Sequence, residues 1–181
     1  FSTAKSTLES KNYTVNTLNL LVTNKIPEDA LAIIIAGPQK PISSAEVNLL
    51  KKYVSAGGSL VVMENPLVAT EFGESIDPLA VYLEKDWGIT LENDIIFDLS
   101  SQQPLNAISA YGNPHPITQN LSEKYVVIMP QARSITLADP APEGVTLTPL
   151  ISTSENSWGE TELNAEGEQY QYDDGKDFAG P

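Results

Sequence analysis

The sequence predicts a three-layer α/β domain built on a mainly parallel sheet, and three observations support this prediction. Residues 31–37 form an unbroken aliphatic run that ends in Gly-Pro, which is typical of a strand buried on both faces. An amphipathic segment follows at residues 43–56, and a second apolar run occupies residues 59–63. Strand, helix and strand in this order indicate a βαβ unit, whose two strands run parallel.

The helix expected over residues 44–56 has sequence signals at both of its ends. Ser43 stands at the N-cap position and Glu46 at N3, which is the spacing of a capping box. Its apolar side chains recur every three or four residues and form one stripe, namely Leu49, Leu50, Tyr53 and Val54. Gly57 and Gly58 then end the helix, because glycine adopts the left-handed conformation of a C′ residue without steric penalty.

The N-terminal part of the chain supplies three further expectations. A short helix is predicted at residues 2–11, with Asn12 as its C′ residue. Apolar and polar residues alternate over residues 13–20, which is the period of a strand. Because the aliphatic run is unbroken, we expect its three isoleucines, residues 33–35, to be almost wholly buried in a central strand.

A second helix is marked in the middle of the chain. Asp77 suits the N-cap position and Pro78 the first helical position, while Gly88 ends the segment. Apolar runs predict three more strands, over residues 94–98, 126–129 and 145–151. Residues 99–124 are rich in Pro, Asn, Gln and Ser, so an irregular loop is expected there.

Charge separates two regions of the chain and excludes a class of partner. The 181 residues carry 24 acids and 10 bases, and the formal net charge of −14 argues against binding to nucleic acid. Residues 155–181 hold eight of the acids and a single lysine. We therefore expect an α/β domain over residues 1–154, followed by an acidic loop or tail over 155–181.

Residue types suited to catalysis are few. The chain has no cysteine and one histidine, which excludes a cysteine nucleophile and a thiolate metal site. His115 lies between two prolines, and we interpret it as a residue that packs or caps this turn rather than as a catalytic base. Asp94 and Asp98 lie on one face of a predicted strand and are interpreted as strand-end residues rather than as a glycosidase pair. Since dinucleotide-binding and phosphate-binding glycine motifs are also missing, neither a cofactor nor a metal is expected.

A candidate binding crevice follows from the predicted topology. Ligands of parallel α/β sheets bind outside the carboxyl ends of the strands. The residues at those ends, together with the histidine, are Gly37, Pro38, Gln39, Glu64, Asn65 and His115. These positions are the candidate site for a small molecule, a peptide or another partner, but the interpretation we favour is that the residues only form turns.

Several short motifs also occur in the order found in a known family. They are Ile-Pro-Glu-Asp at residues 26–29, Ala-Gly-Pro at 36–38, Gly-Gly at 57–58, Glu-Asn-Pro at 64–66, His-Pro-Ile-Thr at 115–118 and Ser-Trp at 157–158. Over most of residues 8–181 this order resembles the soluble domain of the ABC-transporter auxiliary proteins related to the gliding-motility protein GldG.

The resemblance implies a fold, a location and partners. The fold is then flavodoxin-like and similar to class I glutamine amidotransferase-like domains, although this chain lacks the cysteine that amidotransferase chemistry requires. Members of the family are membrane proteins whose soluble region lies on the extracytoplasmic, periplasmic side, beside the permease and ATPase subunits of an ABC transporter. The chain is expected to be a soluble piece of such a protein, whose membrane anchor lies outside it. The resemblance also implies that the acidic segment 155–181 leads into a further strand of the native protein.

The function predicted from the sequence is accordingly non-catalytic. We expect an extracytoplasmic domain of an ABC-transporter-associated membrane protein that acts in binding or in complex assembly. The alternative is a hydrolase-like enzyme on an amidotransferase-like fold, which a cleft joining His115 to Ser157 or to an acid would favour.

Overall fold

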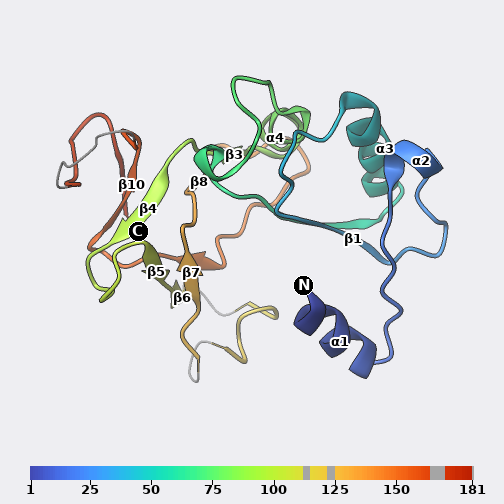
Figure 1. Cartoon of the computed structure of the whole chain (residues 1–181), viewed down its shortest axis with the longest axis horizontal. Helices are drawn as coiled ribbons and strands as arrows, with labels where there is room; N and C mark the ends of the chain where they lie inside the picture. The colour runs from blue at the N-terminus through green and yellow to red at the C-terminus, as the bar shows by residue number, and fades with distance from the viewer. Residues whose placement is uncertain (112–114, 122–124, 164–169, 181) are drawn as a thin grey trace. The chain divides into compact units, whose positions relative to one another are not determined.

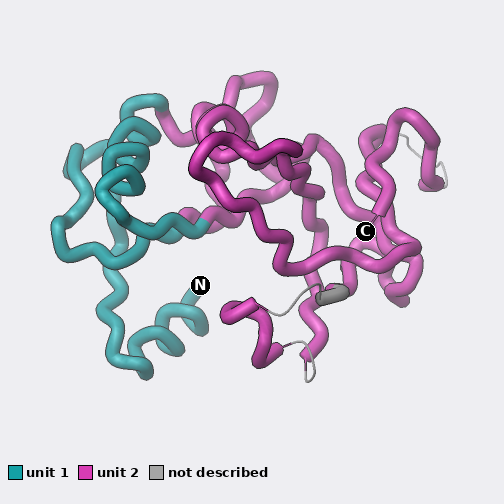
Figure 2. The backbone as a smooth tube through the Cα atoms, turned by 180° about the vertical axis from the view of Figure 1, so that it is seen from behind, with its two compact units in different colours: residues 1–34, 44–61 teal, residues 35–43, 62–181 magenta. Residues whose placement is uncertain are grey.

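The computed structural model describes residues 1–111, 115–121, 125–163 and 170–180. They form two units, one of residues 1–34 and 44–61 and the other of residues 35–43 and 62–181 (Figure 2). The described helices are α1 (Ser2–Ser10), α2 (Leu20–Thr23), α3 (Ser44–Ser55) and α4 (Pro78–Tyr82), with a 3₁₀ turn η1 (Leu67–Ala69) and a π-helical turn η2 (Leu83–Trp87) (Figure 1).

The described strands form one three-stranded and four two-stranded sheets. The largest has the order β11 (Phe178–Ala179), β10 (Ser157–Glu160), β4 (Ile95–Asp98). The two-stranded sheets pair β1 (Ala32–Ala36) with β2 (Ser59–Met63), β3 (Ile89–Leu91) with β8 (Ile135–Leu137), β5 (Asn106–Ile108) with β7 (Ile128–Pro130), and β6 (Ala110–Tyr111) with β9 (Ile151–Ser152). The pairings other than that of β1 with β2 are antiparallel.

The predicted three-layer α/β domain with a mainly parallel, flavodoxin-like or amidotransferase-like sheet is therefore wrong. The order β1, α3, β2 is present as predicted, and the carboxyl ends of the two strands meet, since the Gly37 N–H donates to the Met63 carbonyl at 2.7 Å. The remaining strands pair antiparallel, mostly with partners far away in the chain. Local periodicity identifies a strand but contains no information about its partner, and for this reason the single parallel sheet was expected.

The aliphatic run of β1 is less buried than its sequence predicts. Ile34 is 50% exposed, whereas the prediction placed it wholly inside. Burial alternates along β2 as well, where Val61 and Met63 are 45% and 47% exposed. A strand with apolar residues on both faces needs a layer on each face, and its sequence does not supply the second layer. One face of this strand pair is accordingly half open.

Of the two segments predicted near the N-terminus, the helix is confirmed and the strand is wrong. The helix predicted at residues 2–11 is confirmed as α1, and Asn12 has the positive φ of 66° expected of a C′ residue. The strand predicted at residues 13–20 is wrong, because α2 begins at its last residue and residues 13–19 join no ladder. The Asn19 side chain caps α2 by accepting the Val22 N–H at 3.2 Å, so a local cap is made where alternation alone suggested a strand.

The helix predicted after Asp77 is confirmed at both ends. Asp77 Oδ1 accepts the Leu79 N–H at 3.0 Å, and Pro78 is the first residue of α4. The helical segment continues through η2 and ends at Gly88, whose φ of 68° is the left-handed conformation that glycine adopts most easily. Leu79 is fully buried, so this helix contributes to the core of its unit.

In the second half of the chain the strand predictions hold only in part. The strand at 94–98 is confirmed as β4, whereas β7 covers only the end of the run at 126–129 and β9 only the end of the run at 145–151. The loop expected at 99–124 contains β5 and β6. The acidic segment 155–181, expected to be a loop or tail, contributes β10, and all four residues of this strand are buried. Antiparallel pairing with β4 gives this strand its order, and its sequence shows too few aliphatic residues to indicate it.

Candidate functional site

The predicted crevice residues at the ends of β1 and β2 do lie together. Gly37 approaches the Asn65 side chain, whose Nδ2 lies 3.5 Å from the place that a Cβ of residue 37 would take. Gln39 donates to the Gly37 carbonyl at 3.4 Å and accepts the Glu71 N–H at 2.9 Å, with the half-buried Pro38 between them. These contacts build a turn, and the only strongly buried side chain among the predicted residues is that of Glu64.

His115 lies in a turn of its own. Its Nδ1 accepts the Ile117 N–H at 3.2 Å, and its carbonyl accepts the Thr118 N–H at 2.9 Å, as the turn interpretation expects. Ser157, the hydroxyl considered for a hydrolase, donates instead to the Ser154 carbonyl at 2.7 Å. Each of these two side chains is thus engaged within its own segment.

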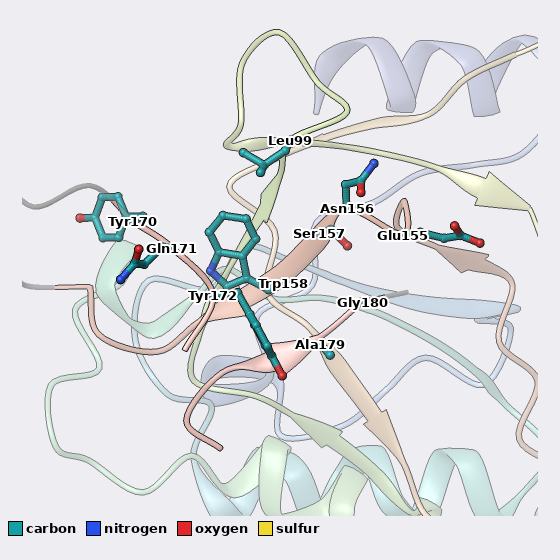
Figure 3. Close-up of a pocket in the computed structure, with 10 residues that line it drawn as sticks. All are labelled: Leu99, Glu155, Asn156, Ser157, Trp158, Tyr170, Gln171, Tyr172, Ala179 and Gly180. Atoms are coloured by element: carbon teal, nitrogen blue, oxygen red, sulfur yellow. The ribbon is translucent and has the colours of Figure 1, made fainter. Parts of the chain in front are cut away.

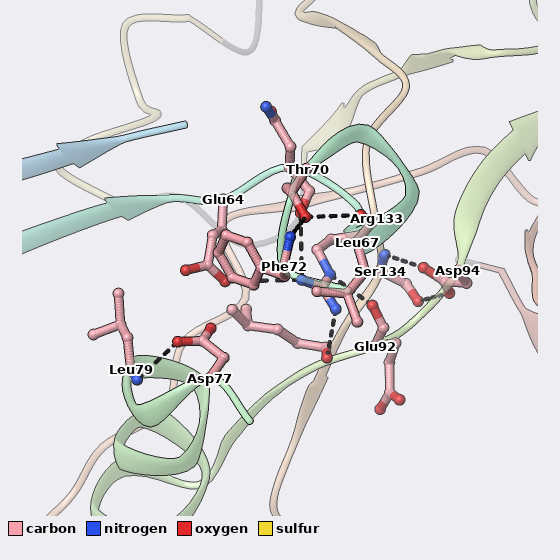
Figure 4. Close-up of polar contacts among 12 residues, drawn as sticks. Glu64, Leu67, Thr70, Phe72, Asp77, Leu79, Glu92, Asp94, Arg133 and Ser134 are labelled. Carbon is pink, nitrogen blue, oxygen red and sulfur yellow. Dashed lines mark hydrogen bonds and ion pairs between the residues drawn. The ribbon is translucent and has the colours of Figure 1, made fainter. Parts of the chain in front are cut away.

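Glu64 sits in a buried polar cluster with Arg133 and Asp77 (Figure 4). The Glu64 side chain is 2% exposed and that of Arg133 is 6% exposed, with 3.8 Å between Oε2 and Nη1. Among the residues that the structure describes, neither carboxylate oxygen of Glu64 accepts a hydrogen bond, and neither does Oδ2 of Asp77. A buried ionised carboxylate without donors is costly, so this cluster is an unusual arrangement.

Arg133 donates its hydrogen bonds to backbone carbonyls rather than to Glu64. Its Nε donates to Glu92 O at 2.6 Å, Nη2 to Leu91 O at 3.0 Å and Nη1 to Asn65 O at 3.4 Å. The planar guanidinium therefore joins the loop after β2, the end of β3 and the segment before β8. Its charge faces Glu64 at ion-pair distance without a hydrogen bond to it.

The environment of Glu64 favours its neutral form. Burial raises the pKa of Glu64 from 4.5 to about 7, aided by the negative charge of Asp77, while Arg133 acts in the opposite direction. Near neutral pH the Glu64 carboxyl group is consequently protonated in part of the molecules. A group with such a pKa is suited to proton exchange, but a side chain 2% exposed does not touch an outside substrate.

The two aspartates of β4 and its flank are also buried, and they are well supplied with donors. Asp94 accepts the Ser134 N–H at 2.8 Å and the Ser134 hydroxyl. Asp98 accepts the N–H groups of Ser100 at 3.0 Å and Ile108 at 2.9 Å, and the Ser154 hydroxyl at 2.5 Å. Burial acts to raise the pKa of Asp98, but these hydrogen bonds outweigh it and hold the pKa below its ordinary value.

An open groove of about 410 Å³ lies beside β10 and β11 (Figure 3). Its lining residues are Leu99, Glu155, Asn156, Ser157, Trp158, Tyr170, Gln171, Tyr172, Ala179 and Gly180. The Phe97 ring supports it from below, stacked on Trp158 with centroids 5.4 Å apart and against Tyr170 at 4.7 Å. Trp158 is buried, whereas Tyr170 and Tyr172 are 40% and 43% exposed, so aromatic surface faces the solvent.

One acid, Glu155, lines this groove, and two further acids accept hydrogen bonds from its aromatic residues. The Tyr172 hydroxyl donates to Asp174 Oδ1 at 3.4 Å, and Trp158 Nε1 donates to Glu160 Oε2 at 3.3 Å. Desolvation and the charges of Asp174 and Asp177 raise the pKa of Tyr172. Sequence analysis missed this groove because it placed residues 155–181 in a solvated tail. The acidic segment contains four aromatic residues, three of which line the groove, and these were the available signal.

The described part of the chain contains no group of three or more His, Asp or Glu side chains arranged to hold a metal ion. Within the same residues, none of the helices has the length and apolarity needed to cross a membrane.

Comparisons with known proteins give one family and one fold. The model of a family described as an ABC-type uncharacterized transport system matches residues 3–181. None of the curated proteins matches the chain. Three chains of solved structures match it. One of them, the mmIFT52 N-terminal domain, is 21% identical over 70% of this chain with a TM-score of 0.52.

The structural match bears on fold alone at this level of identity. The present chain spans about half of that domain's length, since 54% of it is covered. The likeness agrees with an architecture of small mixed sheets and not with the flavodoxin-like arrangement predicted from the sequence.

Proposed function

The chain belongs to the auxiliary family of ABC-type transport systems, and from this membership we propose that it is a non-catalytic recognition domain of such a system. The match of the family model across residues 3–181 is the observation that carries the proposal. Recognition here means binding a partner or a ligand without chemical turnover.

The geometry supports binding rather than turnover. The side chains with catalytic potential are occupied inside the fold: Asp98 holds three donors, Ser157 bonds to the Ser154 carbonyl, and the His115 imidazole accepts a backbone N–H. The aromatic groove beside β10, in contrast, presents half-exposed rings to the solvent. Open apolar surface with polar edges is the usual composition of a binding site.

We further propose the partners and the location. The partners are the permease and ATPase subunits of the transporter, because the chain carries no phosphate-binding loop of its own. The motif order of the sequence supports a GldG-like protein with this domain on the extracytoplasmic side of the membrane. A domain held near a permease by an anchor reaches a high effective concentration, so a weak interface suffices for function.

Affinity purification of the full-length protein from native membranes tests the proposed partners. Permease and ATPase subunits should co-purify after mild crosslinking. Recovery of the protein without transporter subunits contradicts this part of the proposal. Incubation of the purified chain with generic ester, peptide and glycoside substrates should show no turnover above a heat-denatured control, and turnover that increases with protein concentration contradicts the non-catalytic role.

The location is testable because the chain has no cysteine. A Lys11→Cys variant of the full-length protein introduces one thiol into this part of the protein, at an exposed position. A membrane-impermeant maleimide should label this thiol in intact cells with a permeabilised outer membrane. Labelling only after lysis of the cytoplasmic membrane would contradict the extracytoplasmic location.

A further inference from the structure

The aromatic groove combines two features that together select one kind of occupant. The first is a fixed aromatic floor, since Trp158 stacks on Phe97 with an interplanar angle of 18° and Phe97 also contacts Tyr170. The second is negative charge close to the rings, since Glu155 lines the groove and Asp174 accepts from Tyr172. Exposed ring faces attract cations, and neighbouring carboxylates strengthen this attraction.

The surrounding charge is only weakly compensated within the described residues. Lys176 is the single base of the segment 155–181, and it is paired with Glu162 at 2.8 Å. Six of the segment's eight acids lie among the described residues, and together with the single lysine they leave an excess of negative charge. An anionic occupant is repelled by this field, and a neutral occupant gains nothing from it.

The shape of the groove favours a chain segment over an enclosed small molecule. Small ligands generally bury most of their surface in a cavity, whereas this groove is open to the solvent. Its floor includes Ala179 and Gly180, at the outer strand of the three-stranded sheet. An extended peptide can follow such an edge and place one side chain on the rings.

We propose that this groove binds a lysine- or arginine-bearing segment of a partner protein, with the cationic side chain on the rings of Tyr170 and Tyr172. The inference deepens the proposed function and rests on it, because it names the chemistry of the partner. Aromatic rings supply the contact surface, and Glu155 and Asp174 supply the charge selectivity.

Binding of acetyl-pentalysine amide to the full 181-residue chain tests this inference. Calorimetry at 0.15 M NaCl gives the dissociation constant, and Trp158 fluorescence in a Trp87→Phe background reports contact with the groove. The same peptide with every lysine acetylated keeps the length and removes the charge. The unmodified peptide should bind and change the emission of Trp158, and the acetylated one should not. Equal binding of both peptides overturns the inference.

Two tyrosine variants separate the groove from diffuse attraction to a chain of net charge −14. Tyr172→Leu should weaken binding by about fivefold, because it removes a cation-binding ring face and leaves the charge unchanged. Tyr13→Leu is the matched control, since Tyr13 is 54% exposed and lies in the other unit. Equal affinity of the two variants shows diffuse attraction and overturns the inference.

A third variant shows whether Tyr172→Leu weakens binding by loss of the ring or by misfolding. Tyr172→Phe keeps the ring and removes only the hydroxyl that bonds to Asp174, so it should retain binding. If Tyr172→Phe loses as much affinity as Tyr172→Leu, the ring face is not the binding group and the inference fails. Because the peptide assay needs no transporter, its outcome is independent of the co-purification experiment that tests the proposed function.

Discussion

Two buried carboxylate sites of this chain have opposite proton preferences. Asp98 is fully buried and accepts three hydrogen bonds, and its pKa lies below the ordinary value. The side chain of Glu64 is almost as buried, but it faces another carboxyl group, and its pKa rises to about 7. Burial alone therefore does not decide the charge of a carboxylate. The hydrogen-bond donors around a carboxylate decide its charge, and the Arg133 guanidinium, 3.8 Å from Glu64, does not replace such donors.

The largest loss of stability is expected at Asp98, the carboxylate that accepts three hydrogen bonds. Asp98→Ala leaves the N–H groups of Ser100 and Ile108 and the Ser154 hydroxyl without their acceptor, which should cost about 4 kcal/mol of unfolding free energy. Urea denaturation measures the loss, with the exposed Asp29→Ala as control. A loss below about 1 kcal/mol would show that water replaces the carboxylate and would remove the contrast with Glu64.

The second effect is a dependence on pH at Glu64. Because folding raises this pKa from 4.5 to about 7, the bound proton stabilises the fold fully below pH 4.5, and this contribution is lost as the pH rises through about 7. The shift corresponds to about 3 kcal/mol. Glu64→Gln removes the titration and keeps a donor towards Asp77. The stability difference between wild type and this variant should therefore change across that interval, in favour of the variant at high pH.

The control for this prediction is a glutamate that lies in water. Glu71 pairs with Lys40, and its side chain is 69% exposed. The difference in unfolding free energy between Glu71→Gln and wild type, measured by urea denaturation, should stay constant between pH 4.5 and 8. If the stability difference between Glu64→Gln and wild type also stays constant with pH, Glu64 is ionised in the folded state. The contrast between Glu64 and Asp98 is then wrong.

A third prediction tests how rigidly the donors hold Asp94, the other well-supplied aspartate. A Cβ at Gly159 would overlap the carboxyl group of Asp94, which is fixed by Ser134. Gly159→Ala should cost about 2 kcal/mol through this overpacking. Thermal unfolding by circular dichroism measures the effect. An unchanged melting temperature would mean that the carboxylate moves freely, contrary to the hydrogen bonds that define its site.

The same contrast separates what the sequence revealed from what it did not. Signals that act within a few residues were informative: Asp77 with Pro78 predicted the start of α4, Gly88 predicted its end, and Asn12 predicted the end of α1. Such signals concern groups that meet through local backbone geometry. The proximity of Gly37 and Asn65 also followed from the local order of strand, helix and strand.

Features that depend on distant partners were not predicted. Asp98 receives donors from residues 100, 108 and 154, and no spacing rule joins these positions. Glu64 meets Arg133 and Asp77 only because the fold brings three loops together. β10 and the aromatic groove lie in a segment whose acidic composition indicated a tail. Composition describes the average exposure of a segment and misses the antiparallel partner that orders it.

The smallest effect on stability is expected at the start of a helix, where a side-chain acceptor binds the first backbone N–H groups. Asp77 caps α4 by accepting the Leu79 N–H, and Ser43 occupies the corresponding place before α3, which begins at Ser44. Ser43→Ala should cost about 1 kcal/mol, because the first N–H groups of α3 then lack a side-chain acceptor. Ser44→Ala is the matched control, since it removes the same hydroxyl one residue inside the helix and should change stability by less than about 0.5 kcal/mol. Urea denaturation of both variants decides the matter. Equal effects would show that α3 is capped by water, and that the side-chain acceptor seen at Asp77 is not a general requirement in this fold.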